Sequence, residues 1–383
     1  MDGTSPLLNR IEHPSVFSFF SGSGFLDLGF ETEDFEVCYV NEFHKPFLGA
    51  YEYSRNAMNL PGPYYGYDST SIELLNSVTL SKNMASEKKR GKLVGFIGGP
   101  PCPDFSVAGK NSGSKGRNGK LSQVYIDLIC SHRPDFFLFE NVKGLYRTKK
   151  HRTFFELLKR QLRESGYCLH ERLVNSIEYG VAQDRERIIL LGFANYSPSE
   201  SFNWSGRLYG DRRAFEFDWP TTSPFQINGL TKRAGNVPLE LCVQYWFDQN
   251  DVGNHANSRH FFRPRAGRTK METIAEGDDS RKSYKRLHRW RYSPTAAYGN
   301  NEVHLHPYLG RRITVAESLA IQSMPKEFSL PPDMSLSDMF KTIGNGVPFL
   351  AAKGIARSIL EHLRRNDASY RTEHSQSRQS VAA

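Results

Sequence analysis

The sequence is poor in the features that mark secreted, disulfide-linked or membrane-spanning chains. It has only five cysteines, and no two of them form a CxxC pair. Scattered thiols of this kind argue against zinc ribbons and disulfide scaffolds and fit a reducing compartment. The longest apolar runs are far shorter than the ~18 residues of a membrane span, and residues 1–15 lack a secretory signal. We therefore predict a cytoplasmic protein without a membrane partner or a metal site.

Acidic residues are outnumbered, because 50 Lys and Arg face 41 Asp and Glu, which gives a formal net charge of +9. This balance favours a polyanionic partner, although charge alone does not identify one. Part of it is concentrated in "RKSYKRLHRWR" (281–291), where six basic residues alternate with aromatic ones. Such a run is more often a solvated basic loop than a binding site.

Apolar runs alternate with helix-like stretches over the first two hundred residues, which is typical of βαβ units. This alternation predicts an α/β fold with a mostly parallel sheet, and ligands of such sheets bind beyond the carboxyl ends of the strands. Four polar motifs follow predicted strands in this way: a glycine turn, Glu42, a proline turn and Glu140-Asn141. Strands are expected at 16–20, 35–42, 92–99, 135–142 and 185–193, and helices at 45–56, 121–132, 152–166, 313–324 and 348–365.

Regular periodicity fades after about residue 197, where Trp, Tyr, Arg, Asn and Gly become frequent. We therefore predict a catalytic and cofactor-binding domain over 1–196, completed by a C-terminal helix at 336–365, and a smaller irregular domain over 197–335. The polar residues 366–383 are expected to be disordered.

The proline turn "GGPPCPDFS" (98–106) holds a single thiol, Cys102, between prolines. Proline fixes φ and removes a backbone donor, so this run cannot continue a helix or a central strand. The turn is either a rigid structural element with an incidental cysteine or a device that holds a nucleophile. Its local sequence does not decide between the two.

The order of the motifs resembles that of the DNA cytosine-5 methyltransferases of the bacterial restriction–modification type. The similarity extends from about residue 16 to 363, excluding the middle of the variable region. Pro-Cys, Glu-Asn-Val and Gln-x-Arg-x-Arg in this order are specific together, although none is specific alone. The resemblance implies a Rossmann-like S-adenosylmethionine-dependent methyltransferase fold, with residues 197–335 as the target-recognition domain. It rests on the segments "FFSGSG", "YVNEFHK", "YDSTS", "GGPPCPDFS", "FENV", "QDRER", "RRITVAESLAIQSMP" and "IGNGVP".

The family chemistry assigns a role to each polar residue near the predicted strand ends. By resemblance, the Cys102 thiolate adds to C6 of cytosine and makes C5 reactive toward the methyl donor. Glu140 would donate a proton at N3 of the base, and Asn141 would brace the cysteine loop. Arg187 would contact O2 and Arg185 would organise the site. The base that removes the C5 proton is not identified, and water is possible.

The resemblance also assigns the cofactor contacts. Glu42 would hold the ribose of S-adenosylmethionine and Asp68 the adenine amino group. Asn345 would close the pocket from the C-terminal part, while Asp27 and Phe30 are interpreted as fold residues. The methionine side and the pocket lining would come from Phe20, Gly22, Gly24, Pro100 and Leu121.

The chain departs from the family pattern at four positions. Ser18 stands where the family usually has Asp, and Phe25 stands where it has a third glycine. Pro103 replaces the usual Gln after the cysteine, which in the family helps to fill the space that the flipped base vacates or steadies the loop, so this role is not assigned here. Ala316 replaces an Arg. None of these changes alters Cys102, so we expect activity to survive.

The expected partner is double-stranded DNA, from which the target base must be swung out. Residues 106–120, rich in Gly, Ser and Lys, would close over it. We also expect a monomeric protein that is functionally paired with a restriction endonuclease without forming a stable complex with it. Three alternatives stay open: a transfer-RNA cytosine methyltransferase, against which the lack of a Cys-Phe-Thr signature argues, a non-catalytic DNA-binding protein, and a nicotinamide-dependent oxidoreductase.

Overall fold

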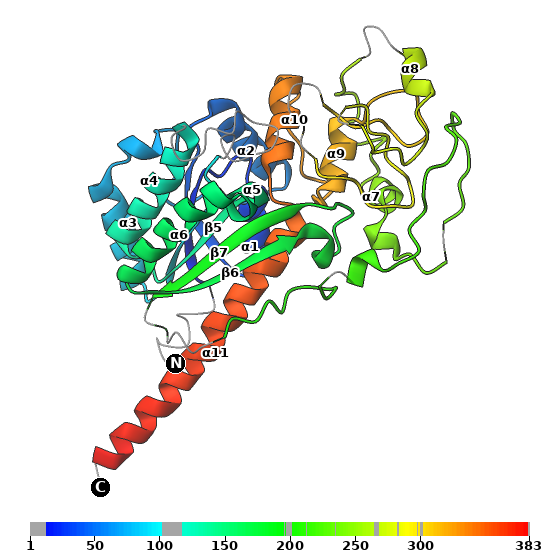
Figure 1. Cartoon of the computed structure of the whole chain (residues 1–383). Helices are drawn as coiled ribbons and strands as arrows, with labels where there is room; N and C mark the ends of the chain where they lie inside the picture. Colours follow the sequence, from blue (N-terminus) through cyan, green and yellow to red (C-terminus); the bar gives the residue numbers. More distant parts are fainter. Residues whose placement is uncertain are drawn as a thin grey trace, which may run out of the picture.

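A computed structural model shows how the chain folds (Figure 1). It describes residues 13–101, 117–194, 196, 201–211, 213–233, 235–263, 268–281, 283–296, 298 and 302–381. Cys102 and most of the 106–120 loop therefore lie outside the described residues. None of the described helices combines the length and apolar character that a membrane crossing needs.

A seven-stranded sheet forms the centre of the catalytic half, in the order β3-β2-β1-β4-β5-β7-β6. The first five strands in this order run parallel, and β7 is antiparallel to both β5 and β6. The predicted mixed α/β fold with a mainly parallel sheet is confirmed. The strands are β1 (Ser15–Phe19), β2 (Glu36–Asn41), β3 (Tyr67–Asp68), β4 (Val94–Gly98), β5 (Phe136–Val142), β6 (Tyr167–Asn175) and β7 (Glu186–Ala194).

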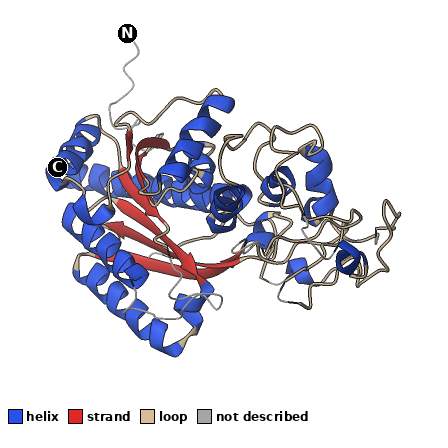
Figure 2. Ribbon diagram, turned by 90° about the horizontal axis from the view of Figure 1, so that it is seen from above, coloured by secondary structure: helices blue, strands red, loops and turns tan. Residues whose placement is uncertain are grey.

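Helices cover both faces of the sheet, as Figure 2 shows. One face packs against α1 and α11 in a core that includes Phe30 and Ile355. The other face packs against α3, α4 and α6 through residues such as Ile129 and Leu158. Strands β1, β4 and β5 are buried on both sides because they lie between these two layers. The helices are α1 (Phe25–Glu31), α2 (Lys45–Ala57), α3 (Ser77–Lys89), α4 (Arg117–His132), α5 (Lys143–Arg147), α6 (Lys149–Glu164), α7 (Val243–Gln249), α8 (Arg268–Glu272), α9 (Val315–Ile321), α10 (Leu336–Asn345) and α11 (Phe349–Val381).

The region after β7 has few regular elements, and buried polar contacts hold its loops in place. Arg286 is fully buried, and its guanidinium donates to the backbone oxygens of Met271, Ile274, His306 and Leu309. An arginine fork can satisfy several carbonyls at once, so one side chain joins the end of α8, and Ile274 just beyond it, to the loop at 306–309. An apolar core containing Phe247 and Phe328 also includes Phe25 of α1, which attaches the region to the catalytic half.

The structure differs from the predicted elements in several places, and α3 and α7 are among the helices that were not predicted. Strands β3 and β6 were not predicted. The expected single helix at 336–365 is two helices, because Gly346, Val347 and Pro348 separate α10 from α11. Helix α11 also continues to Val381 and projects from the body (Figure 1), where composition predicts disorder. The first part of this helix packs against α1 and the sheet, and the last part continues it beyond that contact.

Candidate active site

A cleft of about 1090 Å³ opens beyond the carboxyl ends of β1, β2, β4 and β5, and α10 with the following turn closes its other side. This is the edge at which parallel α/β sheets bind ligands. Pro101 lines the cleft, and the predicted nucleophile Cys102, which lies outside the described residues, follows it in the sequence. The cleft brings together nine of the predicted site residues: Phe20, Gly22, Glu42, Pro100, Leu121, Glu140, Asn141, Arg187 and Asn345.

The glycine turn after β1 forms one wall of the cleft. Gly22 has a positive φ of 57°, and its N–H donates to Oε2 of Glu42 at 2.9 Å. Gly24, also at positive φ, does not line the cleft and instead caps α1. A Cβ on Gly24 would lie 2.7 Å from the Tyr51 ring, so glycine is required there by packing.

Glu42 follows β2 and joins two backbone segments at the cleft wall. Its carboxylate accepts from the N–H of Gly22 and, at 2.7 Å, from the N–H of His44. Burial raises the pKa of the Glu42 carboxyl, and the two backbone hydrogen bonds oppose that rise. A carboxylate held in this way keeps further lone pairs for hydroxyl donors.

Asp68 ends β3 but does not line the cleft, in contrast to its predicted contact with a cofactor. Its two carboxylate oxygens accept from the Tyr39 hydroxyl and from the N–H of Thr70, each at 2.7 Å. Burial would raise the pKa of Asp68, but these hydrogen bonds outweigh it and the pKa is lowered. Residues 71–73, just beyond Asp68, do line the cleft.

Glu140 and Arg187 form an ion pair at the cleft wall, with 3.0 Å between Oε1 and Nε. Their side chains are only 11% and 13% exposed, so the pair is shielded from water. Burial raises the pKa of Glu140, and the guanidinium groups of Arg187 and Arg185 limit the rise. The backbone of Gly99 lies so close that an added Cβ would stand 2.6 Å from Glu140 Oε2. A carboxyl of raised pKa fixed at a cleft wall is suited to donating a proton.

Asn141 links β5 to the proline turn. Its Nδ2 donates to the Pro100 oxygen at 3.4 Å, and its Oδ1 accepts from the N–H of Val142 at 2.9 Å. Asn141 is 1% exposed. The side chain therefore holds the turn that precedes Cys102, while the predicted bracing of the cysteine loop itself stays a prediction.

Arg185 is fully buried behind the cleft and does not line it. Its guanidinium donates to the oxygen of Ala296 at 3.0 Å and to that of Gly344 at 2.7 Å. Both acceptor residues line the cleft. Arg185 thus fixes the wall from outside, which agrees with an organising residue better than with a contact residue.

A buried pair of amides beside Arg185 was not predicted. Gln183 Nε2 donates to Gln322 Oε1 at 3.0 Å, and Gln183 Oε1 accepts from the N–H of Ala296 at 3.1 Å. Gln322 Nε2 donates to the Ile343 oxygen at 2.5 Å, next to the turn that contains Asn345. Both glutamines stand in motifs of the sequence, "QDRER" and "AIQSM", but no periodicity signals that they meet.

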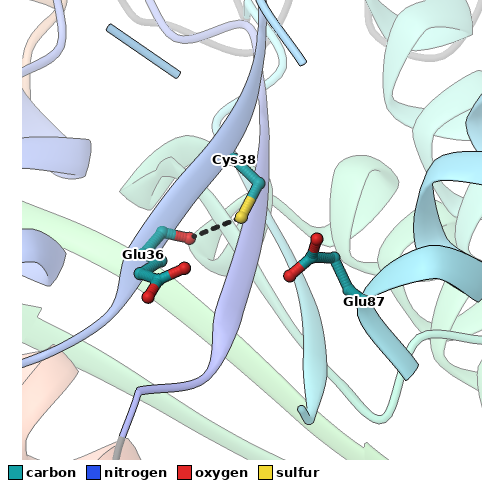
Figure 3. A group of neighbouring side chains, drawn as sticks. All are labelled: Glu36, Cys38 and Glu87. Atoms are coloured by element: carbon teal, nitrogen blue, oxygen red, sulfur yellow. Dashed lines mark hydrogen bonds between the residues drawn. The ribbon is translucent and has the colours of Figure 1, made fainter. Parts of the chain in front are cut away.

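A group of possible metal ligands lies away from the cleft, near the amino end of β2 (Figure 3). It consists of Glu36, Cys38 and Glu87, whose ligand atoms lie within 4.8 Å of one another. Burial raises the pKa of the Cys38 thiol to about 11, and the carboxylates pair with Lys92 and Arg90. A neutral thiol and two paired carboxylates make a poor metal site.

Residues 15–361 match the model of the protein family described as C-5 cytosine-specific DNA methylase. The chain belongs to this family. It is therefore a DNA cytosine-5 methyltransferase, and a nicotinamide-dependent oxidoreductase is excluded. Among similar proteins, the type II methyltransferase M.NmeDI of Neisseria meningitidis serogroup C is 60% identical over 91% of this chain and 84% of that protein. M.FnuDI of Fusobacterium nucleatum is 29% identical over 91% and 94%.

Solved structures agree with the methylase fold. A candidate DNA modification methyltransferase encoded in an E. coli prophage superposes with a TM-score of 0.63 at 20% identity, covering 92% of this chain and 99% of that one. A Spodoptera frugiperda DNMT2 mutant gives a TM-score of 0.57 at 14% identity over 90% and 99%. These likenesses concern the fold alone.

One departure from the methylase pattern has a visible partner. Ser18 Oγ donates to Oδ1 of Asp27 at 2.8 Å, and the Tyr51 hydroxyl donates to Oδ2 at 2.9 Å. Asp27 is fully buried, and burial raises its pKa to about 7. The usual Asp at position 18 would place a second carboxyl beside this one, so Ser18 and Asp27 fit each other.

Proposed function

We propose that this methylase is the modification enzyme of a type II restriction–modification system and acts on one cytosine of a specific duplex site. The names of M.NmeDI and M.FnuDI, both type II methyltransferases, support this assignment. The observation that carries the mechanism is the Glu140–Arg187 pair on the wall of the cleft that Pro101 also lines. A paired endonuclease, a monomeric state on DNA and a cytoplasmic location stay predictions.

The cleft fits S-adenosylmethionine in size and in the chemistry of its walls. Its volume exceeds that of a single small ligand, and Gly22 presents backbone without a side chain. Glu42 would accept from the ribose hydroxyls, while Phe20 and Leu121 would supply apolar contact and Asn345 would close the turn. Asp68 would hold the adenine amino group, next to residues 71–73 of the lining, and it accepts from the N–H of Thr70 in the same segment. When bound, S-adenosylmethionine supplies an electrophilic methyl group.

The protein residues would activate cytosine in a fixed order. The Cys102 thiolate would form a bond to C6, and the ring electrons would move toward C5 and N3. Glu140, whose pKa is raised, would hold a proton at N3, and Arg187 would bind the O2 oxygen. After methylation, loss of the C5 proton would expel the thiolate and restore the aromatic ring. The identity of the base that takes this proton is left open.

The target carbon lies inside the base stack, so the nucleotide must leave the duplex at a cost of roughly a few kcal/mol. We assign residues 106–120 to closing over the extruded base. The irregular region within 197–335 would read the surrounding site through base-edge contacts. Buried side chains such as Arg286 hold its loops through hydrogen bonds to backbone oxygens. Surface residues can therefore vary while the scaffold stays fixed.

Bisulfite sequencing of DNA from cells that express the protein tests the proposal, because it reports activity, target base and site together. Cys102→Ala is the matched control. In cells that express this variant, bisulfite should convert the target cytosine, while the variant protein should still bind the cofactor. In the presence of S-adenosylmethionine, a duplex with 5-fluorocytosine at the identified position should become covalently attached to the parent protein and not to the Cys102→Ala variant, because the methylated ring has no C5 proton to lose. Labelled methyl groups transferred to transfer RNA but not to duplex DNA would overturn the proposal, and so would DNA binding without any transfer.

A further inference from the structure

A group of cationic side chains follows the catalytic motif directly and has no role in the chemistry above. We call it the basic ridge, and it consists of Lys143, Arg147, Lys149, Lys150 and Arg152. No Asp or Glu occurs between residues 141 and 155. The ridge includes α5 and the first turn of α6, and Val142, which immediately precedes it, lines the active-site cleft.

The ridge lies on the edge of the sheet where the cleft opens. Helix α5 follows β5 at its carboxyl end, and α6 then runs back along the sheet, so the first turn of α6 stays near that edge (Figure 1). Five helical residues span about 7.5 Å. A base that reaches Glu140 must come from a duplex lying across this edge, and the grooves of B-DNA are about 6–12 Å wide. The ridge is therefore within reach of phosphates that flank the target.

Salt bridges neutralise only part of the ridge. Lys143 and Arg147 both pair with Glu186, at 2.7 and 2.9 Å. Arg152 pairs with Glu156 at 3.8 Å and stacks on the Tyr146 ring, 4.3 Å from its centroid. Lys149 and Lys150 are exposed, and among the described residues no carboxylate forms an ion pair with them. Their charges are thus available to a polyanion.

Helix stability does not explain these cations. The first four residues of α6 include Lys149, Lys150 and Arg152, and its N-cap Thr148 provides no side-chain cap. The positive end of a helix dipole disfavours cations in the first turn, where acidic residues are usual. Cations at the start of a helix therefore need a favourable contact outside the helix, and a phosphate backbone beside them would provide one.

We propose that the basic ridge binds the phosphate backbone of the DNA flanking the target cytosine, with Lys149 and Lys150 as its principal contacts. The proposal rests on the proposed function only in taking duplex DNA as the substrate. Because phosphate contacts carry no sequence information, the ridge would strengthen binding to cognate and non-cognate duplexes alike. It positions the duplex and takes no part in methyl transfer.

The test compares two double variants that change the net charge equally. Lys149→Gln/Lys150→Gln removes two ridge charges, and Arg160→Gln/Arg163→Gln removes two exposed charges from the far part of the same helix, about 15–20 Å away. Binding is measured between 50 and 200 mM salt with a 30-base-pair duplex of mixed sequence and with one carrying the site found by bisulfite sequencing. Methyl transfer at saturating DNA is measured in parallel.

The ridge variant should lower the slope of log K against log salt by about 1.8, since each phosphate contact contributes about 0.9. The ratio of parent to ridge-variant affinity should consequently fall about tenfold between 50 and 200 mM, equally on both duplexes. The Arg160/Arg163 variant should keep the parent slope, and all three proteins should share one turnover rate. An unchanged slope in the ridge variant, or equal changes in both variants, would overturn the proposal. A parent protein without methyl transfer would instead refute the proposed function.

Discussion

Replacing Gly99 with alanine should disable the enzyme through a single displaced carboxyl. The new Cβ would lie 2.6 Å from Glu140 Oε2, and an ordinary contact begins near 3.4 Å, so the carboxyl must retreat by about 0.8 Å. A misplacement of about 1 Å at a reacting group lowers a rate by up to about a hundredfold. We expect kcat/KM to fall about 10- to 100-fold, which corresponds to roughly 1.4–2.7 kcal/mol of transition-state stabilisation.

The assay is transfer of labelled methyl groups into duplex DNA, together with thermal unfolding. Gly49→Ala is the matched control, because its added Cβ meets nothing within 4 Å and its place inside α2 favours alanine. It should leave activity unchanged and stabilise the fold by about 0.5–1 kcal/mol. In a Glu140→Gln background, Gly99→Ala should have little further effect. Full additivity of the two changes, or parent activity in a folded Gly99→Ala protein, would refute the reasoning.

Three further predictions concern the turn beside the cleft and the buried polar residues of the region after β7. Gln322→Leu deprives the Ile343 oxygen of its hydrogen-bond donor, so the turn holding Asn345 should loosen. The KM for S-adenosylmethionine should rise by a factor several-fold larger than the factor by which kcat falls, and an unchanged KM would contradict this. Arg286→Met leaves four backbone oxygens without their donor and should lower the free energy of unfolding, measured in urea, by about 3–5 kcal/mol. A loss under about 1 kcal/mol would show that Arg286 does not hold these loops. Burial lowers the pKa of His304 to about 3 and that of His306 to about 4. Each ring therefore gains its proton on unfolding below about pH 6.5, so the unfolded state binds more protons. The free energy of unfolding should fall by up to about 1.4 kcal/mol per pH unit per histidine as the pH drops from 6.5 to 5. A His304→Gln variant should show a shallower decline, and an identical decline would contradict the assignment.

The sequence predicted Glu140 at a strand end but not how Arg187 reaches it. The apolar run of β5 ends at Glu140, so its place at the edge of the sheet followed from the pattern. Strand β7 is antiparallel, and its register pairs Val142 with Arg187, so the start of β7 lies at the end of β5. A parallel strand would have put Arg187 at the opposite edge. Strand direction depends on the unpredicted hairpin partner β6, and local periodicity does not reveal it.

Asp68 and Gly24 show a second limit. Both stand in motifs that resemble those of the family, yet neither lines the cleft. Asp68 is engaged by Tyr39 because β2 and β3 pair in a register that opposes Asn41 and Asp68. Gly24 is fixed by the Tyr51 ring packed against it. Side-chain contacts across strands and helices depend on this tertiary geometry, which a local motif does not show, and the cofactor contacts of both residues stay predictions.

The packing of α11 against α1 has a consequence for how the enzyme is made. The core that supports the glycine turn combines Leu26 and Phe30 with Ile355 and Ile359, which are separated by more than three hundred positions of chain. During synthesis the apolar face of α1 therefore stays exposed until α11 has left the ribosome. A truncated translation product that ends before α11 would contain Cys102, Arg185 and Arg187 but would lack the core that supports the glycine turn. Such incomplete copies would therefore have no methyltransferase activity.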